Sequence, residues 1–147
     1  MDFFKAMEIT ASGLNAERSR MNTIASNLAN AKTTRTADGS GPYKRLDPVF
    51  RSVPMSEKFA DLVGEKAAQA SSSVKVESIR QDDSPPQMVY DPSHPDANEA
   101  GYVALPNVNV VQEMVNMITA SRAYEAGVTV MQTVKGMARS ALNIGGG

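Results

Sequence analysis

The chain has 147 residues, with 15 Lys and Arg, 16 Asp and Glu, and a formal net charge of −1 at pH 7. This length fits one domain, and the nearly balanced charge argues against a surface for nucleic acid or anionic lipid. The absence of cysteine excludes disulfides, thiolate catalysis and zinc held by thiolates. No apolar run reaches the roughly 18 residues that span a membrane, and we expect no cleavable secretory signal and no direct membrane insertion.

The prolines divide the chain into three parts, because all eight lie between Pro42 and Pro106. Helix-compatible ends therefore enclose a turn-rich middle. We predict a mainly α fold with a small β part, in which long N- and C-terminal helices pair as an antiparallel or coiled-coil-like core. Residues 1–35 and 106–147 would form one discontinuous domain, and residues 36–105 a proline-containing, β-rich middle region with a β-hairpin.

The first predicted helix runs from Asp2, a candidate N-cap, to about residue 31. Apolar residues recur in it every seven positions, a spacing that favours packing along another helix, and the C-terminal helix is the obvious partner. The residues assigned to this packing are Phe4, Met7, Leu14, Met21 and Leu28.

The middle region begins with a flexible connector over residues 32–42. Residues 43–53 can form a strand that is interrupted or bent at Pro48. Residues 74–80 alternate apolar and polar side chains, the best strand signal in the chain. Residues 87–90 form a second short strand after Pro85-Pro86, and the two strands around this break suggest a hairpin.

Two segments of the middle region have no regular strand pattern. Residues 55–73 form a variable insert, which is either a loop or a small helix and ends in a serine run. Residues 91–97 contain two prolines and are expected to form a rigid extended loop, from which residues 101–103 lead into the last helix.

The only histidine, His94, lies near three carboxylates, Asp91, Asp96 and Glu99. One histidine with loose carboxylates is a weak signal for a transition-metal site. No catalytic triad or phosphate-binding loop is identifiable. We therefore expect no enzyme, no cofactor and no metal.

The C-terminal helix should lie within the stretch from Pro106 to Leu142: Pro106 blocks helix upstream, Asn109 can act as N-cap, and Gln112 is placed as in a capping box. A helix of about 33 residues would be roughly 50 Å long, more than the rest of the chain can cover. Apolar residues also lie off its main face, at Val111, Val115 and Ile118 and, on the opposite flank, at 130, 134, 137 and 141. The main face comprises Val110, Met114, Met117, Tyr124, Val128, Met131 and Leu142.

Two motifs resemble the family of bacterial flagellar rod and hook proteins. The N-terminal motif lies within residues 25–31, and the C-terminal motif covers residues 105–111, 113–118 and 120–126. One departure is Gly127, where the family usually has asparagine. The family-motif residues are Ser26, Asn27, Leu28, Ala29, Asn30, Pro106, Asn107, Glu113, Met114, Arg122 and Tyr124.

The resemblance implies a structural subunit of the proximal rod in the basal body of the bacterial flagellum, a helical polymer that serves motility by carrying motor torque to the hook. Its implied partners are other rod proteins, copies of itself, the flagellar type III export apparatus and, further, membrane-ring components. The rod would lie in the periplasmic space. A soluble helical adaptor or export chaperone that binds partner helices is the alternative.

Overall fold

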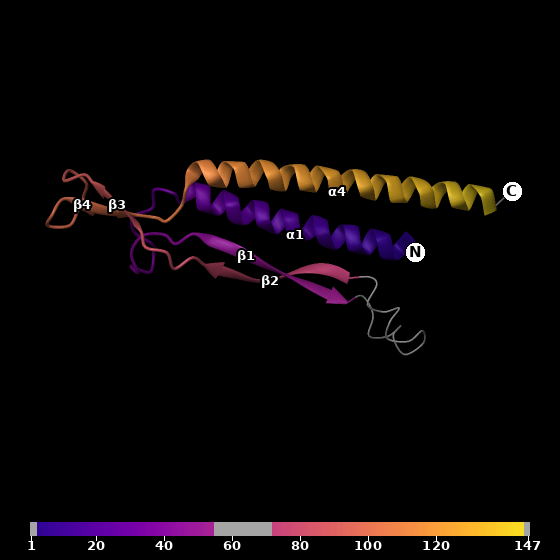
Figure 1. The fold of residues 1–147 in the computed structure, drawn as a ribbon, viewed down its shortest axis with the longest axis horizontal. Helices are drawn as coiled ribbons and strands as arrows, with labels where there is room; N and C mark the ends of the chain where they lie inside the picture. The colour runs from indigo at the N-terminus through magenta and orange to yellow at the C-terminus, as the bar shows by residue number, and fades with distance from the viewer. Residues whose placement is uncertain (1–2, 55–71, 146–147) are drawn as a thin grey trace. The chain divides into compact units, whose positions relative to one another are not determined.

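The computed structural model describes residues 3–54 and 72–145 (Figure 1). In chain order the elements are helix α1 (Phe3–Ala29), strands β1 (Leu46–Pro54), β2 (Ser72–Gln81), β3 (Gln87–Tyr90) and β4 (Tyr102–Leu105), and helix α4 (Val110–Gly145). The predicted fold class is confirmed: two long terminal helices enclose a small β part. The suggested cap Asp2 and most of the insert at 55–73 lie outside the described residues.

The chain forms two compact units, and both long helices contribute to each of them. The first unit consists of Met1–Ser19, Val49–Ser78 and Ala120–Gly147, and the second of Arg20–Pro48 and Ile79–Thr119. The predicted division into a discontinuous helical domain and a middle region stays a prediction.

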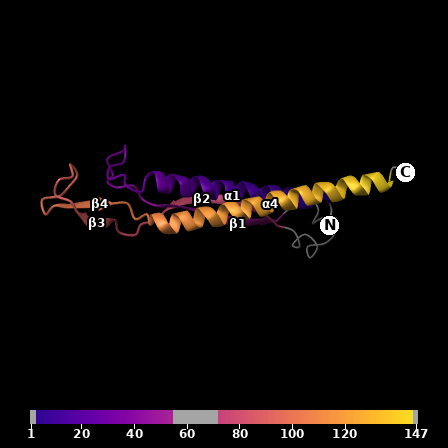
Figure 2. The ribbon, with the colours of Figure 1, turned by 90° about the horizontal axis from the view of Figure 1, so that it is seen from above.

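In the first unit, the N-terminal part of α1 lies beside the C-terminal part of α4 and runs antiparallel to it (Figures 1 and 2). The helices approach closely at Gly127, where an added Cβ would lie 2.8 Å from Cδ2 of Leu14. The β1–β2 ribbon contacts α1 through a hydrogen bond in which the Val74 N–H donates to Oγ of Ser12 over 3.1 Å.

The second unit contains the remaining parts of both helices and the β3–β4 hairpin. Tyr90 pairs with Tyr102 in antiparallel register, and their rings meet edge to face with centroids 5.3 Å apart. Gly101 has φ +81°, a left-handed conformation that glycine adopts without strain. Its carbonyl accepts the Asp91 N–H over 2.9 Å, which closes the hairpin loop.

The predicted hairpin between residues 74–80 and 87–90 is wrong. Strand β2 pairs with β1, and β3 pairs with β4. A tight hairpin needs backbone donors in its turn, and Pro85 and Pro86 supply none. The segment leading to α4 is itself strand β4, and residues 91–97 form successive turns rather than an extended loop.

The predicted N-cap of α4 is confirmed. Oδ1 of Asn109 accepts the Gln112 N–H over 3.1 Å, which satisfies one of the free donors of the first turn. The capping box is only half formed, because Nε2 of Gln112 donates to Asn116 over 3.3 Å. In the described part of the chain, neither helix combines the length and apolarity that membrane crossing requires.

Candidate functional site

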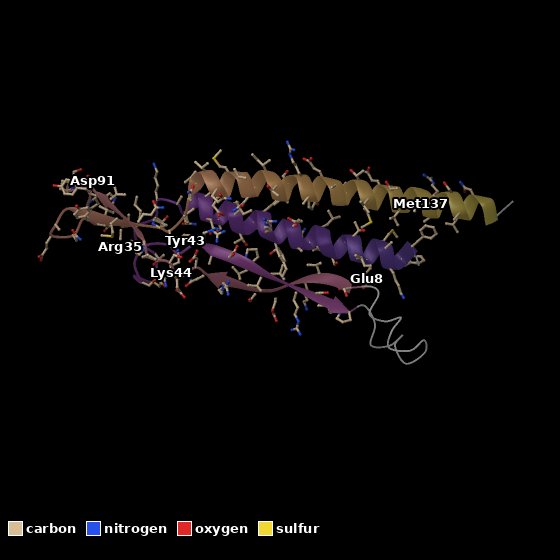
Figure 3. The ribbon with its side chains drawn as sticks, in the orientation of Figure 1. Glu8, Arg35, Tyr43, Lys44, Asp91 and Met137 are labelled. Atoms are coloured by element: carbon tan, nitrogen blue, oxygen red, sulfur yellow. The ribbon has the colours of Figure 1, made fainter. Side chains whose placement is uncertain are left out.

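A buried polar network in the second unit joins the end of α1 to the start of α4. We call it the polar clamp: the side chains of Asn27, Arg45, Asn107 and Glu113 with the backbone of Leu46. Tyr43, labelled in Figure 3, lies next to it. Asn27 and Glu113 are 0% and 1% exposed, so any unmade hydrogen bond here would carry a large desolvation cost.

Asn27 uses all the hydrogen-bonding capacity of its side chain. Nδ2 donates to the Leu46 carbonyl over 2.8 Å and to Oε2 of Glu113 over 3.1 Å. Oδ1 accepts the Leu46 N–H over 2.8 Å and the Tyr43 hydroxyl over 2.9 Å. A primary amide has two N–H donors and two acceptor lone pairs. Asn27 is therefore fully satisfied although it is fully buried.

Glu113 is the acceptor at the centre of the clamp. Its Oε1 accepts from Nε of Arg45 over 2.9 Å and from Nδ2 of Asn116 over 3.3 Å, and its Oε2 accepts from Asn27. A buried carboxylate requires a cation and hydrogen-bond donors around it, because an unpaired buried charge is strongly destabilising. Arg45 supplies the cation from the residue before β1 and Asn27 supplies a donor from α1, so the clamp joins these two segments to α4 at one side chain.

The charge of Arg45 is stabilised by this arrangement. Its side chain is 23% exposed, and this partial burial, the largest single influence, acts to lower its pKa. The hydrogen bond and charge of Glu113, with a smaller effect of Asp47, outweigh burial, so the pKa of Arg45 is raised above its usual value.

Asn107 connects the segment before α4 to the residues that precede β1 and follow β2, at one end of the β1–β2 pairing. Its Oδ1 accepts the Arg45 N–H over 2.9 Å, and its Nδ2 donates to the carbonyls of Asp82 and Ser84 over 3.0 and 3.3 Å. The preceding Pro106 is less than 2% exposed. The start of α4 is thus held by backbone groups as well as by Glu113.

A second, more exposed contact ties the connector to the β3–β4 loop. Asp96 accepts from Oγ1 of Thr34 over 2.8 Å and pairs with Arg35. The Thr34 hydrogen bond, followed by the Arg35 charge, keeps the pKa of Asp96 below its ordinary value despite the opposing effect of desolvation. His94 Nδ1 accepts the Asp96 N–H over 3.1 Å. The described residues contain no group of three or more potential metal-ligating side chains.

The predicted helix-packing residues fall into two classes. Met7, Leu14, Met21, Leu28, Met117, Tyr124, Val128 and Met131 are half-buried, whereas Phe4, Val110, Met114 and Leu142 are exposed. One series of buried and half-buried positions in α4 alternates at steps of four and three, as in a coiled-coil seam. They are Glu113, Met117, Ala120, Tyr124, Gly127, Met131 and Val134.

The clamp brings members of both family motifs together. Asn27 comes from the N-terminal motif, and Asn107 and Glu113 come from the C-terminal motif. Pro106 lies buried beside them, and Ser26 is 3.4 Å from the Tyr43 hydroxyl. Asn30 donates to the Ser26 carbonyl over 2.9 Å. Leu28 and Tyr124 are half-buried, and Ala29, Met114 and Arg122 are exposed.

The sequence reasoning missed Arg45 and Tyr43, which it assigned only to a strand region. A usable signal was present: Glu113 lies in seam register with Met117, Ala120 and Tyr124. A charged residue at such a position requires a partner of opposite charge. The polar segment between the first helix and the first strand contains Arg45 and could have supplied that partner.

The start of α4 also carries an uncovered apolar surface. We call it the α4 patch: Val111, Met114, Val115 and Ile118, which are 52–72% exposed. Glu113 is the only charged residue between positions 110 and 121, and it is buried. The solvent-facing side of these three turns therefore has no charged side chain, which is unusual for a surface helix.

Paired terminal helices and a small β part, without a group of potential metal ligands among the described residues, are the features expected of a structural subunit. A family model for the C-terminal part of flagellar basal body rod FlgEFG proteins matches residues 99–144, and a flagella basal body rod protein model matches residues 7–35.

Relatives named flagellar basal-body rod protein FlgC match nearly the whole chain. Identity is 42% over 151 residues for Bacillus subtilis, with 99% of each chain covered, and 41% over 157 residues for Borreliella burgdorferi, with 98% covered. For Salmonella typhimurium it is 39% over 145 residues, with 99% covered. The chain belongs to the FlgC family of flagellar basal-body rod proteins and is a structural subunit of the rod.

Proposed function

We propose that this chain polymerises, with copies of itself and with other rod proteins, into the proximal rod and transmits motor torque to the hook. The observation that carries the proposal is the α4 patch. Burial of a residue such as Val or Ile contributes roughly 1.5–3 kcal/mol, so this surface favours contact with neighbouring subunits.

The mechanical part of the proposal follows from the helices. An α-helix rises about 1.5 Å per residue, so the 36 residues of α4 extend over roughly 54 Å. Helices that pack against each other along such lengths resist bending and twisting because every turn has a partner. Stiffness of this kind is what transmission of torque needs, and no chemical step is involved. We propose no catalytic role and no cofactor.

The route and neighbours of the subunit extend the same proposal. The rod would lie in the periplasmic space, which the subunit would reach through the flagellar type III export apparatus. Membrane-ring components would be neighbours of this rod tier. Copurification of the chain with export components, and its absence from rods of export-deficient cells, would test this part.

The assembly proposal is tested by placing a charge in the α4 patch. Val115→Asp and Ile118→Asp keep solvent-exposed positions, so the isolated chain should retain its helix content. Incorporation into rods should be lost, because each variant would bury an unpaired carboxylate at the subunit contact. Gln132→Asp, also exposed on α4 but outside the α4 patch, is the matched control and should assemble. Normal motility of both patch variants would refute the role of the patch.

The adaptor alternative predicts different behaviour in solution. A helical adaptor saturates at a fixed small complex, whereas a rod subunit keeps adding to a growing assembly. Sedimentation of the purified chain with and without rod partners separates the two. The family to which the chain belongs favours the rod subunit.

A further inference from the structure

The apolar seam between α1 and α4 is repetitive, and repetition makes its register ambiguous. In α1, Met7, Leu14 and Met21 follow one another at intervals of seven residues. In α4, Ala120, Gly127 and Val134 do the same. Moving one helix by seven residues, about 10.5 Å, would replace apolar neighbours with other apolar neighbours. Met also adapts readily to altered surroundings.

The polar clamp does not repeat. Seven residues after Glu113 lies Ala120, whose side chain accepts no hydrogen bond, and seven residues after Asn27 lies Thr34, beyond the end of α1. Asn27 is also joined to both backbone groups of Leu46. A displaced helix pair would therefore separate Asn27 from Glu113 and leave buried polar groups without partners, which is strongly unfavourable.

We propose that the polar clamp is a register lock: it selects one of several alignments of α1 and α4 that all keep apolar residues in the seam, although only the observed one places Leu14 opposite a glycine. Buried ion pairs contribute little net stability compared with apolar residues of similar volume, whereas a mismatched buried charge is costly. A single polar position is known to fix alignment in coiled coils in this way. The clamp therefore discriminates between alignments more than it stabilises the correct one.

Disulfide mapping tests the proposal, and the absence of native cysteine makes the mapping clean. Leu14→Cys with Gly127→Cys reports the alignment seen in the first unit, where Leu14 packs on Gly127. Leu14→Cys with Ala120→Cys, and Leu14→Cys with Val134→Cys, report alignments displaced by one repeat in either direction. Each pair is oxidised in the purified full-length chain, after circular dichroism has confirmed helix content.

With the clamp intact, only the 14–127 pair should form a disulfide in high yield. The clamp is then replaced by Asn27→Leu, Arg45→Met and Glu113→Leu, which keep side-chain volume and should keep helix content. In this background the displaced pairs should form disulfides as well, beside the 14–127 pair. The control is a chain in which the exposed Lys44–Asp83 ion pair is replaced by Lys44→Leu and Asp83→Leu. This chain should form the 14–127 disulfide alone.

Two outcomes would overturn the register lock. One is a helical clamp-replaced chain that still forms only the 14–127 disulfide, since the apolar seam would then suffice. The other is failure of the 14–127 pair in the parent chain, since no defined alignment would exist. If the triple replacement loses its helices, Glu113→Gln is tested by the same criteria. This substitution keeps the shape of the side chain but replaces one carboxylate oxygen with an N–H₂ group, which cannot accept a hydrogen bond from Arg45 or Asn27. Displaced disulfides should then appear.

Discussion

Asn27 combines complete burial with four side-chain hydrogen bonds, to Leu46, Tyr43 and Glu113. Asn27→Ala would remove all of them and leave several buried groups unsatisfied, at about 1–3 kcal/mol for each such group. We expect the free energy of unfolding to fall by more than about 2 kcal/mol. Denaturant titration followed by circular dichroism measures this change.

Asn22→Ala is the matched control, because Asn22 lies on the same helix and is exposed. Surface changes of this type usually stay within about 0.5 kcal/mol. Equal losses of stability in the two variants would contradict the importance assigned to the Asn27 hydrogen bonds.

Asp96 should make the contact between the connector and the β3–β4 loop sensitive to acid. Its pKa is lowered in the folded chain by Thr34 and Arg35, so the folded state favours the ionised carboxylate. This contribution is present above the unfolded pKa and is lost as the pH falls through the lower folded pKa. Backbone NMR signals of Thr34 and Asp96 should therefore shift together only at a pH below the ordinary value of 3.8.

Asp96→Asn keeps an acceptor for Thr34 but removes the titrating group. In this variant the Thr34 signal should no longer follow pH in that range. A Thr34 titration that persists in Asp96→Asn would assign the effect to another carboxylate.

At the scale of elements, the approach of α1 to α4 in the first unit depends on a missing side chain. An alanine Cβ at position 127 would lie 2.8 Å from Cδ2 and 3.3 Å from Cγ of Leu14, whereas nothing lies within 4 Å of the corresponding site at Gly136. Gly136→Ala should raise the free energy of unfolding by about 1 kcal/mol through helix propensity. Gly127→Ala gains the same stabilisation from helix propensity, but it forces Leu14 to move, which typically costs about 1–3 kcal/mol.

We therefore expect Gly136→Ala to be the more stable variant by about 1–3 kcal/mol. Thermal and denaturant unfolding of the two variants measure the difference. Adding Leu14→Ala to Gly127→Ala should remove the clash, so the two substitutions should be non-additive. Equal stabilisation by both glycine replacements would show that the helices can separate slightly without cost.

For the molecule as a whole, local patterns predicted the elements better than their pairing. Proline placement and apolar periodicity located both helices, and the Asn109 cap follows directly from its residue type. Strand pairing did not follow, because β3 is short and its partner, β4, lies beyond an eleven-residue loop (91–101) that no local signal joins to it. The clamp was equally non-local: Asn27 and Glu113 are 86 positions apart, and only the fold brings them together.

Shortening the insert between β1 and β2 tests whether rod assembly requires this part of the chain. The two strands already pair where the described residues end, with Oγ of Ser73 donating to the Val53 carbonyl over 3.3 Å. A short connection therefore suffices to join them, and the entropy of loop closure changes little with length. Replacing residues 56–71 by a short Gly-Ser linker should leave rod assembly and motility largely intact.

A Gly-Ser replacement of unchanged length serves as the control for that deletion. Loss of assembly in the shortened chain alone would show that length matters, and loss in both would show that the insert sequence itself makes a subunit contact. Electron microscopy of isolated basal bodies distinguishes these results.

The hydrogen bonds between Asn27 and Leu46 also bear on solubility. A strand that presents unpaired N–H and C=O groups is a template on which another chain can add, the first step towards amyloid-like aggregation. At Leu46 both groups are occupied by one amide side chain from α1, while the neighbouring Arg45 carbonyl accepts the Asp82 N–H. Because the Asn27 side chain of α1 occupies both backbone groups of Leu46, another strand cannot pair with this first residue of β1. The polar clamp therefore also protects concentrated subunits from pairing through this part of the ribbon.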